Sequence, residues 1–144
     1  MIHYALGFAF NVGLTQVALI EKLKPDWQKG KLNGIGGKVN NFENYNLAMV
    51  REFEEETGVK TQEGEWRARG VIYRPNDLKC SVYSTVLPLD RFLSIRTMEA
   101  EKVCLFPLDE LYRYRYRLID NLLGLVGLCT IDPAGAPFFH LEYE

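Results

Sequence analysis

The sequence contains few of the residues that stabilise exported or zinc-binding proteins. Its 144 residues include only two histidines and three cysteines, Cys80, Cys104 and Cys129. An odd number of cysteines cannot form a complete disulfide framework, and these lie too far apart for the paired spacing of a zinc site. We therefore expect reduced thiols and a cytoplasmic protein.

The sequence also lacks an excess of positive charge, a long apolar run and a leader-like start. The formal net charge is −2 and the isoelectric point is about 5.8, so no overall basic field is available to duplex nucleic acid or an anionic membrane. The apolar runs are well short of the roughly 18 residues that a spanning helix needs. Residues 1–4 contain no lysine or arginine, which argues against a signal peptide. We expect neither duplex nucleic acid nor a membrane as a partner.

The composition is that of an ordinary globular protein. Apolar residues make up 47% and charged residues 25% of the chain, which matches the average for folded domains. A chain of this length predicts one domain over residues 1–144.

Runs of aromatic and β-branched residues alternate with two segments of helical pattern. Strands are predicted at residues 4–10, 12–20, 66–73, 79–87 and 103–106, with a short one near Leu32. Helices are predicted between Asn44 and Gly58 and from Asp120 or Asn121 to Cys129, with a turn or short helix at residues 107–111. Strands interspersed with helices predict an α/β fold with a mixed sheet between helices.

The first predicted helix carries a cluster of carboxylates. At 100° per residue, Glu52, Glu55 and Glu56 are expected to share one face, with Met49, Val50 and Phe53 on the opposite side. Like charges at this spacing cost about 0.2–0.5 kcal/mol per pair. A hard divalent cation with oxygen ligands would relieve the repulsion. The alternative is a solvated charged face with no ligand.

The spacing around these glutamates resembles a known signature. Gly37 is followed after five residues by Glu43, and after seven more by Arg-Glu-Phe-Glu-Glu-Glu-Thr-Gly-Val at residues 51–59. This pattern is similar to the Nudix box of the Nudix (MutT-like) hydrolases at every fixed position. Phe53 departs mildly, because a smaller aliphatic residue is commoner there. The resemblance implies an α/β/α sandwich with a mixed β-sheet.

The resemblance also implies a metal and its ligands. Relatives are Mg²⁺-dependent, with Mn²⁺ as a substitute, and hydrolyse a phosphoanhydride of a nucleoside diphosphate linked to another moiety. Glu55 and Glu56 match the principal carboxylate ligands, and Gly37 matches a residue whose carbonyl binds the metal. Glu52 matches the residue that completes the metal site or deprotonates the attacking water; we favour the role of general base.

Further residues are implied around this centre. Arg51 and Glu43 match a pair that orients the catalytic glutamates through a salt bridge. Relatives often recruit another carboxylate from a loop, and Glu101 is the candidate here, with Glu99 as the second choice. The competing interpretation is that both are ordinary exposed loop acids.

Candidates for substrate recognition lie outside the glutamate helix. Relatives that act on oxidised purine nucleoside triphosphates contact the purine through an Asn at the position of Asn33 or through one at the start of the last helix, which Asn121 matches loosely. Both residues also suit turns and helix caps. Lys38 is a further candidate for substrate binding. Trp27 could stack on a base, but packing across its loop is favoured. The Tyr-Arg repeat at residues 112–117 could contact bases or phosphates, but an amphipathic edge strand or a solvated turn is favoured.

The leading hypothesis is hydrolysis of a purine nucleoside triphosphate, including an oxidised one, to monophosphate and pyrophosphate. The alternatives are ADP-ribose, a nucleotide sugar or a dinucleotide as substrate, and a non-catalytic nucleotide-binding module. The sequence leaves open the physiological substrate, the phosphorus attacked, the number of metal ions and whether the chain forms a homodimer.

Overall fold

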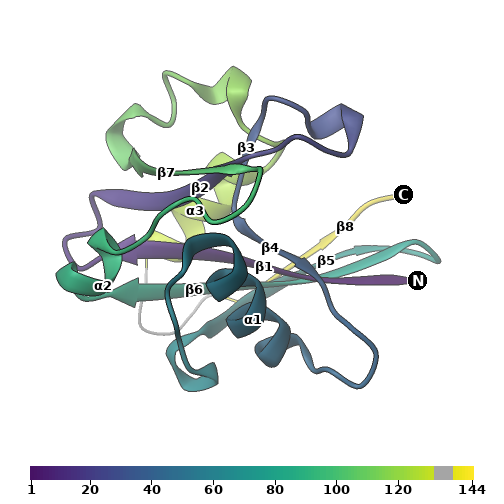
Figure 1. Ribbon diagram of the computed structural model, residues 1–144. Coiled ribbons are helices and arrows are strands. Elements are labelled where there is room, and N and C mark those ends of the chain that lie inside the picture. Colours follow the sequence, from purple (N-terminus) through teal and green to yellow (C-terminus); the bar gives the residue numbers. More distant parts are fainter. Residues whose placement is uncertain (132–137) are drawn as a thin grey trace.

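The computed structural model describes residues 1–131 and 138–144 and has a mixed β-sheet with helices on both faces (Figure 1). In the described part, an eight-stranded sheet runs in the order β3-β2-β1-β6-β5-β8, with β4 on β1 and β7 on β2. The β1–β6 and β5–β8 pairs are parallel and the others antiparallel. The strands are β1 (Ile2–Asn11), β2 (Gln16–Glu21), β3 (Leu32–Asn33), β4 (Ile35–Lys38), β5 (Arg67–Arg74), β6 (Leu78–Leu87), β7 (Lys102–Pro107) and β8 (Phe139–Glu142).

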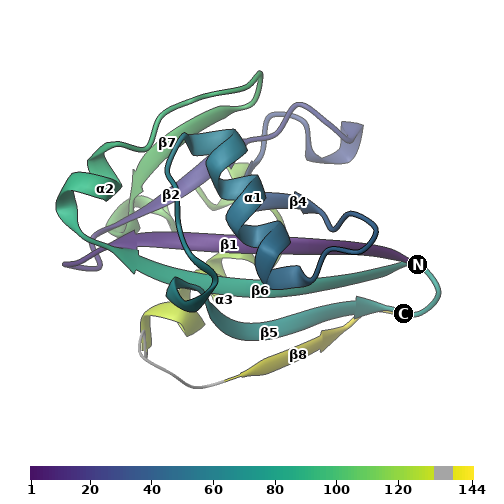
Figure 2. The same cartoon turned by 60° about the horizontal axis from the view of Figure 1, so that its bottom comes forward.

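The helices lie on opposite faces of this sheet. Figure 2 shows α1 in front of the sheet and α3 behind it. The α-helices are α1 (Tyr45–Thr57), α2 (Leu89–Leu93) and α3 (Leu122–Ile131). Short 3₁₀ helices lie at Asp26–Gln28, Glu63–Glu65, Leu108–Glu110 and Arg115–Arg117.

Each face of the sheet has its own apolar core. Along β1, Ala5 and Ala9 pack into the core that contains α1, whereas Phe8 and Phe10 pack into the core that contains α3. This alternation follows from the two-residue period of a strand. Both phenylalanines are fully buried, and each such side chain contributes roughly 1.5–3 kcal/mol through burial. The α/β/α arrangement with a mixed sheet is therefore confirmed.

The sheet is splayed between β1 and β2. These strands pair at Phe10 and Val17, and beyond that point β4 pairs with β1 while β3 pairs with β2. The glycine segment that precedes the glutamate helix therefore lies in the opening between two central strands.

The sequence prediction was wrong at the first turn. A strand was expected from Val12, but β2 begins at Gln16. The Asn11 side-chain oxygen accepts hydrogen bonds from the backbone N–H of Thr15 at 2.8 Å and of Gln16 at 3.0 Å. These bonds close a longer turn, and Val12 is left exposed.

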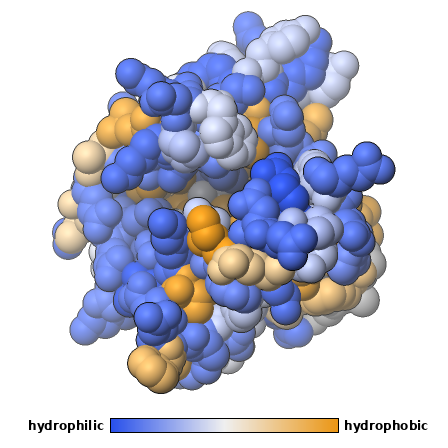
Figure 3. Space-filling view, turned by 90° about the vertical axis from the view of Figure 1, so that its right-hand side faces the viewer, coloured by the Kyte–Doolittle hydropathy of each residue, from blue (hydrophilic) through white to orange (hydrophobic). Residues whose placement is uncertain are grey.

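The last predicted helix is confirmed as α3, but it is buried on one side only. Leu123 is exposed, while the buried side chains are those of Leu122, Leu125, Val126 and Cys129. Among the described residues, no helix is long and apolar enough to cross a membrane. The face at the right of Figure 1 is mostly hydrophilic, with scattered apolar patches (Figure 3).

Candidate functional site

The glutamate helix α1 begins and ends where the sequence predicts. The Asn44 side chain accepts a hydrogen bond from the Leu47 N–H at 2.8 Å, which satisfies one of the free donors of the first turn. Gly58 adopts the left-handed conformation with φ of 76°, and its N–H donates to the Glu54 carbonyl. These two ends fix which glutamates lie beside the glycine segment.

The loop between α2 and β7 lies against the C-terminal end of α1. The backbone N–H of Arg96 donates to the Thr57 carbonyl at 3.1 Å, and that of Met98 donates to the Glu56 carbonyl at 3.2 Å. These bonds bring the acids Glu99 and Glu101 to the helix, and both act electrostatically on Glu56. The structure thus brings the loop candidates and the helix glutamates together.

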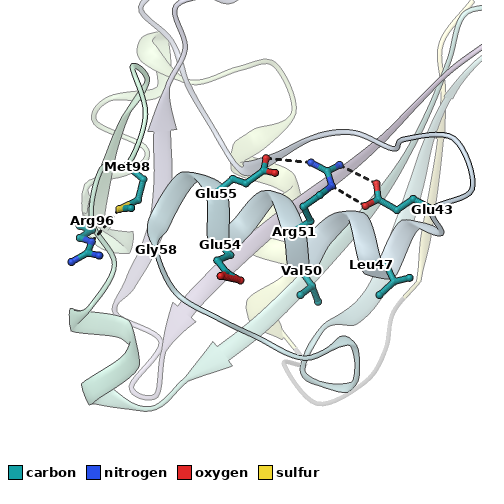
Figure 4. A pocket seen from close by; sticks show the side chains of 9 residues that line it. All are labelled: Glu43, Leu47, Val50, Arg51, Glu54, Glu55, Gly58, Arg96 and Met98. Carbon is teal, nitrogen blue, oxygen red and sulfur yellow. Dashed lines mark hydrogen bonds and ion pairs between the residues drawn. The ribbon is translucent and has the colours of Figure 1, made fainter.

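Arg51 is the centre of a charged network. Its guanidinium binds Glu43 through two hydrogen bonds of 2.8 and 2.9 Å and donates to Glu52 at 2.9 Å and Glu55 at 3.2 Å. Figure 4 shows Glu43 and Glu55 on either side of it. A fourth partner is the Lys38 carbonyl at 2.9 Å. The hydrogen bond from Arg51 is the main cause of a lowered pKa at Glu43, so this pair stays ionised and holds two further carboxylates in place.

The Glu52 carboxylate lies directly against the backbone of Gly37. A Cβ at Gly37 would come within 2.5 Å of the Glu52 Cδ and Oε1 atoms. Glycine is therefore required for the close approach of this strand to the helix. Burial raises the pKa of Glu52, and the Arg51 guanidinium opposes that shift.

Glu56 lies on the buried side of α1, which corrects the expected division into an acidic and an apolar face. Met49 was placed opposite the glutamates, but residues seven apart on a helix lie within about 20° of each other. Glu56 is consequently only 8% exposed and Met49 is fully buried. Of the described atoms, none forms a hydrogen bond with Glu56 Oε2. Burial, followed by the charge of Glu52, raises the pKa of Glu56 to about 8.

Glu101 is held by the end of β2. One carboxylate oxygen binds Lys22 Nζ at 2.9 Å and the other accepts from the Leu23 N–H at 2.7 Å. Partial burial alone would raise the pKa of Glu101, but these hydrogen bonds lower it overall. Lys22 also acts electrostatically on Glu56. Sequence reasoning missed Lys22, because it lies 79 residues from Glu101 in the chain and no local motif marks it.

Within residues 1–131 and 138–144, no three His, Cys, Asp or Glu side chains already converge as a metal-ligand group. The reason is visible in the contacts: Arg51 holds Glu52 and Glu55, and Lys22 holds Glu101. The residues nevertheless fit a divalent cation. A buried carboxylate oxygen without a partner beside other acids is the donor that such a cation binds.

The substrate candidates occupy neighbouring segments. The Asn33 side-chain oxygen accepts from the Gly34 N–H at 2.8 Å, and its amide nitrogen has a long contact of 3.4 Å to Gln28. Asn121 is exposed in a left-handed conformation immediately before α3. The Ile119 N–H donates to the Leu32 carbonyl, which draws the two asparagine segments together. Lys38 is exposed at the end of β4.

An open groove of about 770 Å³ runs along the outer side of α1. It borders the charged network, and the residues that line it are shown in Figure 4. They are Glu43, Leu47, Val50, Arg51, Glu54, Glu55, Gly58, Arg96 and Met98. The network around Arg51 is thus accessible from solvent.

Comparison with known proteins gives one family and one fold. The model of the NUDIX domain matches residues 5–122. A MutT structure described for Aliivibrio salmonicida and Vibrio cholerae is 23% identical, with a TM-score of 0.68 over 87% of this chain and 94% of that one. The NUDIX domain of Shewanella oneidensis NrtR, complexed with ADP ribose, is 14% identical, with a TM-score of 0.74 over 93% and 89% of the two chains.

A third solved structure is a bifunctional NMN adenylyltransferase/ADP ribose pyrophosphatase from Francisella tularensis, complexed with AMP and a Mn ion. It is 14% identical, with a TM-score of 0.73 over 91% of this chain and 41% of that one. No curated protein matches the sequence significantly. At these sequence identities, the similarity to solved structures establishes the fold alone. The family is established by the NUDIX domain match, which covers most of the chain.

Proposed function

The chain belongs to the NUDIX domain family of pyrophosphohydrolases, which act on phosphoanhydrides, and we propose that it hydrolyses a purine nucleoside triphosphate, including an oxidised one, to monophosphate and pyrophosphate. The MutT likeness supports this substrate class. So does the glycine segment preceded by Asn33, which resembles that of relatives acting on oxidised purine nucleotides. The Asn33 and Asn121 amides each offer a donor and an acceptor to a base edge.

The observation that carries the proposal is the state of Glu56. A carboxylate that is 8% exposed and lies beside Glu52 is unfavourable in its charged form, so it binds either a proton, with a pKa of about 8, or a cation. Glu55 and Glu56 would hold Mg²⁺ or Mn²⁺ together with the Gly37 carbonyl, and Glu52 beside them would deprotonate the attacking water. Glu101, or Glu99 in its place, would complete the set after leaving Lys22. The bound metal would lower the pKa of a coordinated water and neutralise charge on the phosphoryl oxygens.

The side chains around this set prepare the attack. Glu52 is the proposed general base, because burial raises its pKa toward the range in which a carboxylate accepts a proton efficiently. Arg51 holds Glu52 and Glu55 in place, and Glu43 in turn fixes Arg51. Lys38, exposed beside the glycine segment, is the residue that we propose to bind a substrate phosphate.

A second candidate substrate is ADP-ribose, and it is favoured by a specific observation. Two of the solved structures above contain ADP ribose or carry the name of an ADP ribose pyrophosphatase. The same acidic centre would serve either reaction, since both substrates contain a diphosphate.

The test is an assay with Mg²⁺ and a panel of nucleotides that includes dGTP, oxidised dGTP and ADP-ribose, with product analysis. Glu55→Gln should lower turnover about 100-fold or more while the protein stays folded. Glu54→Gln is the matched control, because Glu54 points away from Arg51 on the same helix (Figure 4). Wild-type protein that binds a nucleotide but turns over none of the panel would favour a non-catalytic module.

A further inference from the structure

Residues 112–117, which we call the Tyr–Arg segment, form an exposed aromatic and basic surface. Of the two forms favoured from the sequence, an amphipathic edge strand and a solvated turn, the segment adopts the second, since it consists of exposed turns and the 3₁₀ helix Arg115–Arg117. All six side chains are exposed. The segment concentrates three positive charges in a chain whose net charge is −2.

Arg115 organises two of the tyrosine rings. Its guanidinium carbon lies 4.4 Å from the centre of the Tyr112 ring and 4.6 Å from that of Tyr116. It also donates hydrogen bonds to the Tyr112 carbonyl at 3.0 Å and the Tyr116 hydroxyl at 3.1 Å. Tyr112 is nevertheless 66% exposed and Tyr116 is 79% exposed. Cation–π contacts thus hold two rings in place while leaving most of their surface open.

The segment is fixed to the body of the protein. Leu111 and Leu118, at its two ends, are buried in the core beneath α3. Tyr114 packs edge-on against Phe106 of β7, with 5.8 Å between ring centres. The segment therefore has one anchoring tyrosine and two exposed ones, in distinct roles.

The Tyr–Arg segment and the loop that carries Trp27 are both tied to β3. Just after the segment, the Ile119 N–H donates a hydrogen bond to the Leu32 carbonyl at 3.0 Å. In the Trp27 loop, the Gln28 side-chain oxygen accepts one from the Asn33 side-chain amide at 3.4 Å. Figure 1 shows the two loops on either side of β3. Trp27 is 67% exposed. Exposed aromatic rings thus flank the strand that leads into the glycine segment.

We propose that the Tyr–Arg segment binds single-stranded nucleic acid. Alternating rings and cations suit a ligand that alternates bases with phosphates, and stacking on aromatic rings is the common basis of single-strand recognition. A mononucleotide offers only one base, whereas two exposed rings about one arginine suit successive bases. Arg113, whose side chain is 74% exposed, forms an ion pair of 3.7 Å with Glu110, so a phosphate bound there would compete with this surface pair. This binding is separate from the hydrolytic reaction and does not require it.

The test uses a single-stranded oligonucleotide of about 12 nucleotides with a 5′-hydroxyl end and a 3′ fluorophore, with binding followed by anisotropy without metal. Tyr112→Ala/Tyr116→Ala should weaken binding about tenfold or more. Arg115→Lys should also weaken binding, because it retains the charge but loses the planar group that holds both rings. Arg74→Ala, at the end of β5, is the charge control and should change binding less than about twofold.

Two further results decide the proposal. An unlabelled duplex of the same sequence should compete at least about tenfold less well, because its bases are not available for stacking. Nucleotide hydrolysis is measured separately on the same variants, so failure of the proposed reaction would be seen independently. Equal binding by wild type and the double tyrosine variant, with unchanged melting temperatures, would overturn the proposal, as would equal competition by duplex.

Discussion

Glu56 is a buried carboxylate with several other acids near it. Its neighbours Glu52, Glu99 and Glu101 all disfavour its ionised form, and Lys22 only partly compensates. The buried position follows from helix geometry, since Glu56 lies two turns after the core residue Met49. A charged carboxylate there needs a cation, so its proton and a metal ion compete for one place.

The first prediction concerns the pH dependence of stability without metal. The pKa of Glu56 is about 8 in the folded protein, above its ordinary value of 4.5. The stability that the protonated Glu56 side chain contributes is therefore fully present below pH 4.5 and is lost as pH rises through about 8. In EDTA, wild type should lose about 5 °C or more in melting temperature relative to Glu56→Gln between acidic pH and pH 8. Parallel melting curves for the two proteins would contradict the assignment, and Glu54→Gln serves as the control.

The second prediction compares two adjacent glycines. A Cβ at Gly37 would meet the Glu52 carboxylate at 2.5 Å, whereas a Cβ at Gly36 would meet the Ala5 carbonyl oxygen at 1.9 Å. Gly37→Ala should lower kcat about 100-fold with little change in melting temperature, because a side chain can move away. Gly36→Ala should destabilise the sheet instead. The measurement is kcat and thermal unfolding for both variants, and a reversed pattern would show that Gly37 does not position Glu52.

At the scale of elements, α1 is defined by its two ends and by the loop that closes over it. The third prediction is that Asn44→Ala lowers the free energy of unfolding by about 1 kcal/mol, because the Leu47 N–H loses its acceptor. Denaturant unfolding measures this loss, and kcat should stay within about twofold. Asn41→Ala, at an exposed position before the helix, is the matched control. Equal stability of the two variants would mean that the cap contributes nothing.

An element could be predicted from the sequence when the interactions that form it join residues close together in the chain. The helix of α1 was predictable because Asn44 and Gly58 are local signals. By contrast, β4 contains two glycines, and its strand conformation comes from pairing with β1. The four-residue β8 likewise depends on pairing with β5. The five-residue α2 was not predicted either, since it is too short for a clear helical period.

The candidate site shows the same limit. The salt bridge between Arg51 and Glu43 was expected from the resemblance, and the structure contains it. The contact of Lys22 with Glu101 joins distant parts of the chain, and no pattern indicated it. The depth at which Glu56 is buried also escaped prediction, because the helical-wheel estimate placed Met49 on the wrong side.

At the scale of the whole molecule, the protein has a net charge of −2 and an acidic centre that would act on an anionic substrate. These charges repel unless cations lie between them, so metal binding should stabilise the fold as a whole. The fourth prediction is that Mg²⁺ or Mn²⁺ at about 100 times its Kd adds about 2.7 kcal/mol to the free energy of unfolding. EDTA should reverse the increase, and Glu56→Gln should abolish it. An equal increase in wild type and Glu56→Gln would place the metal elsewhere.

The most direct test of the central claim follows product release by wild type, Glu56→Gln and Glu54→Gln at pH 8 over a titration of Mg²⁺. The account predicts that wild type and Glu54→Gln form a nucleoside monophosphate with a shared Mg²⁺ dependence. Glu56→Gln should be slower by about 100-fold or more at saturating metal. Full activity of Glu56→Gln, or wild-type turnover that persists without a divalent cation, would contradict the claim that this buried carboxylate binds the metal.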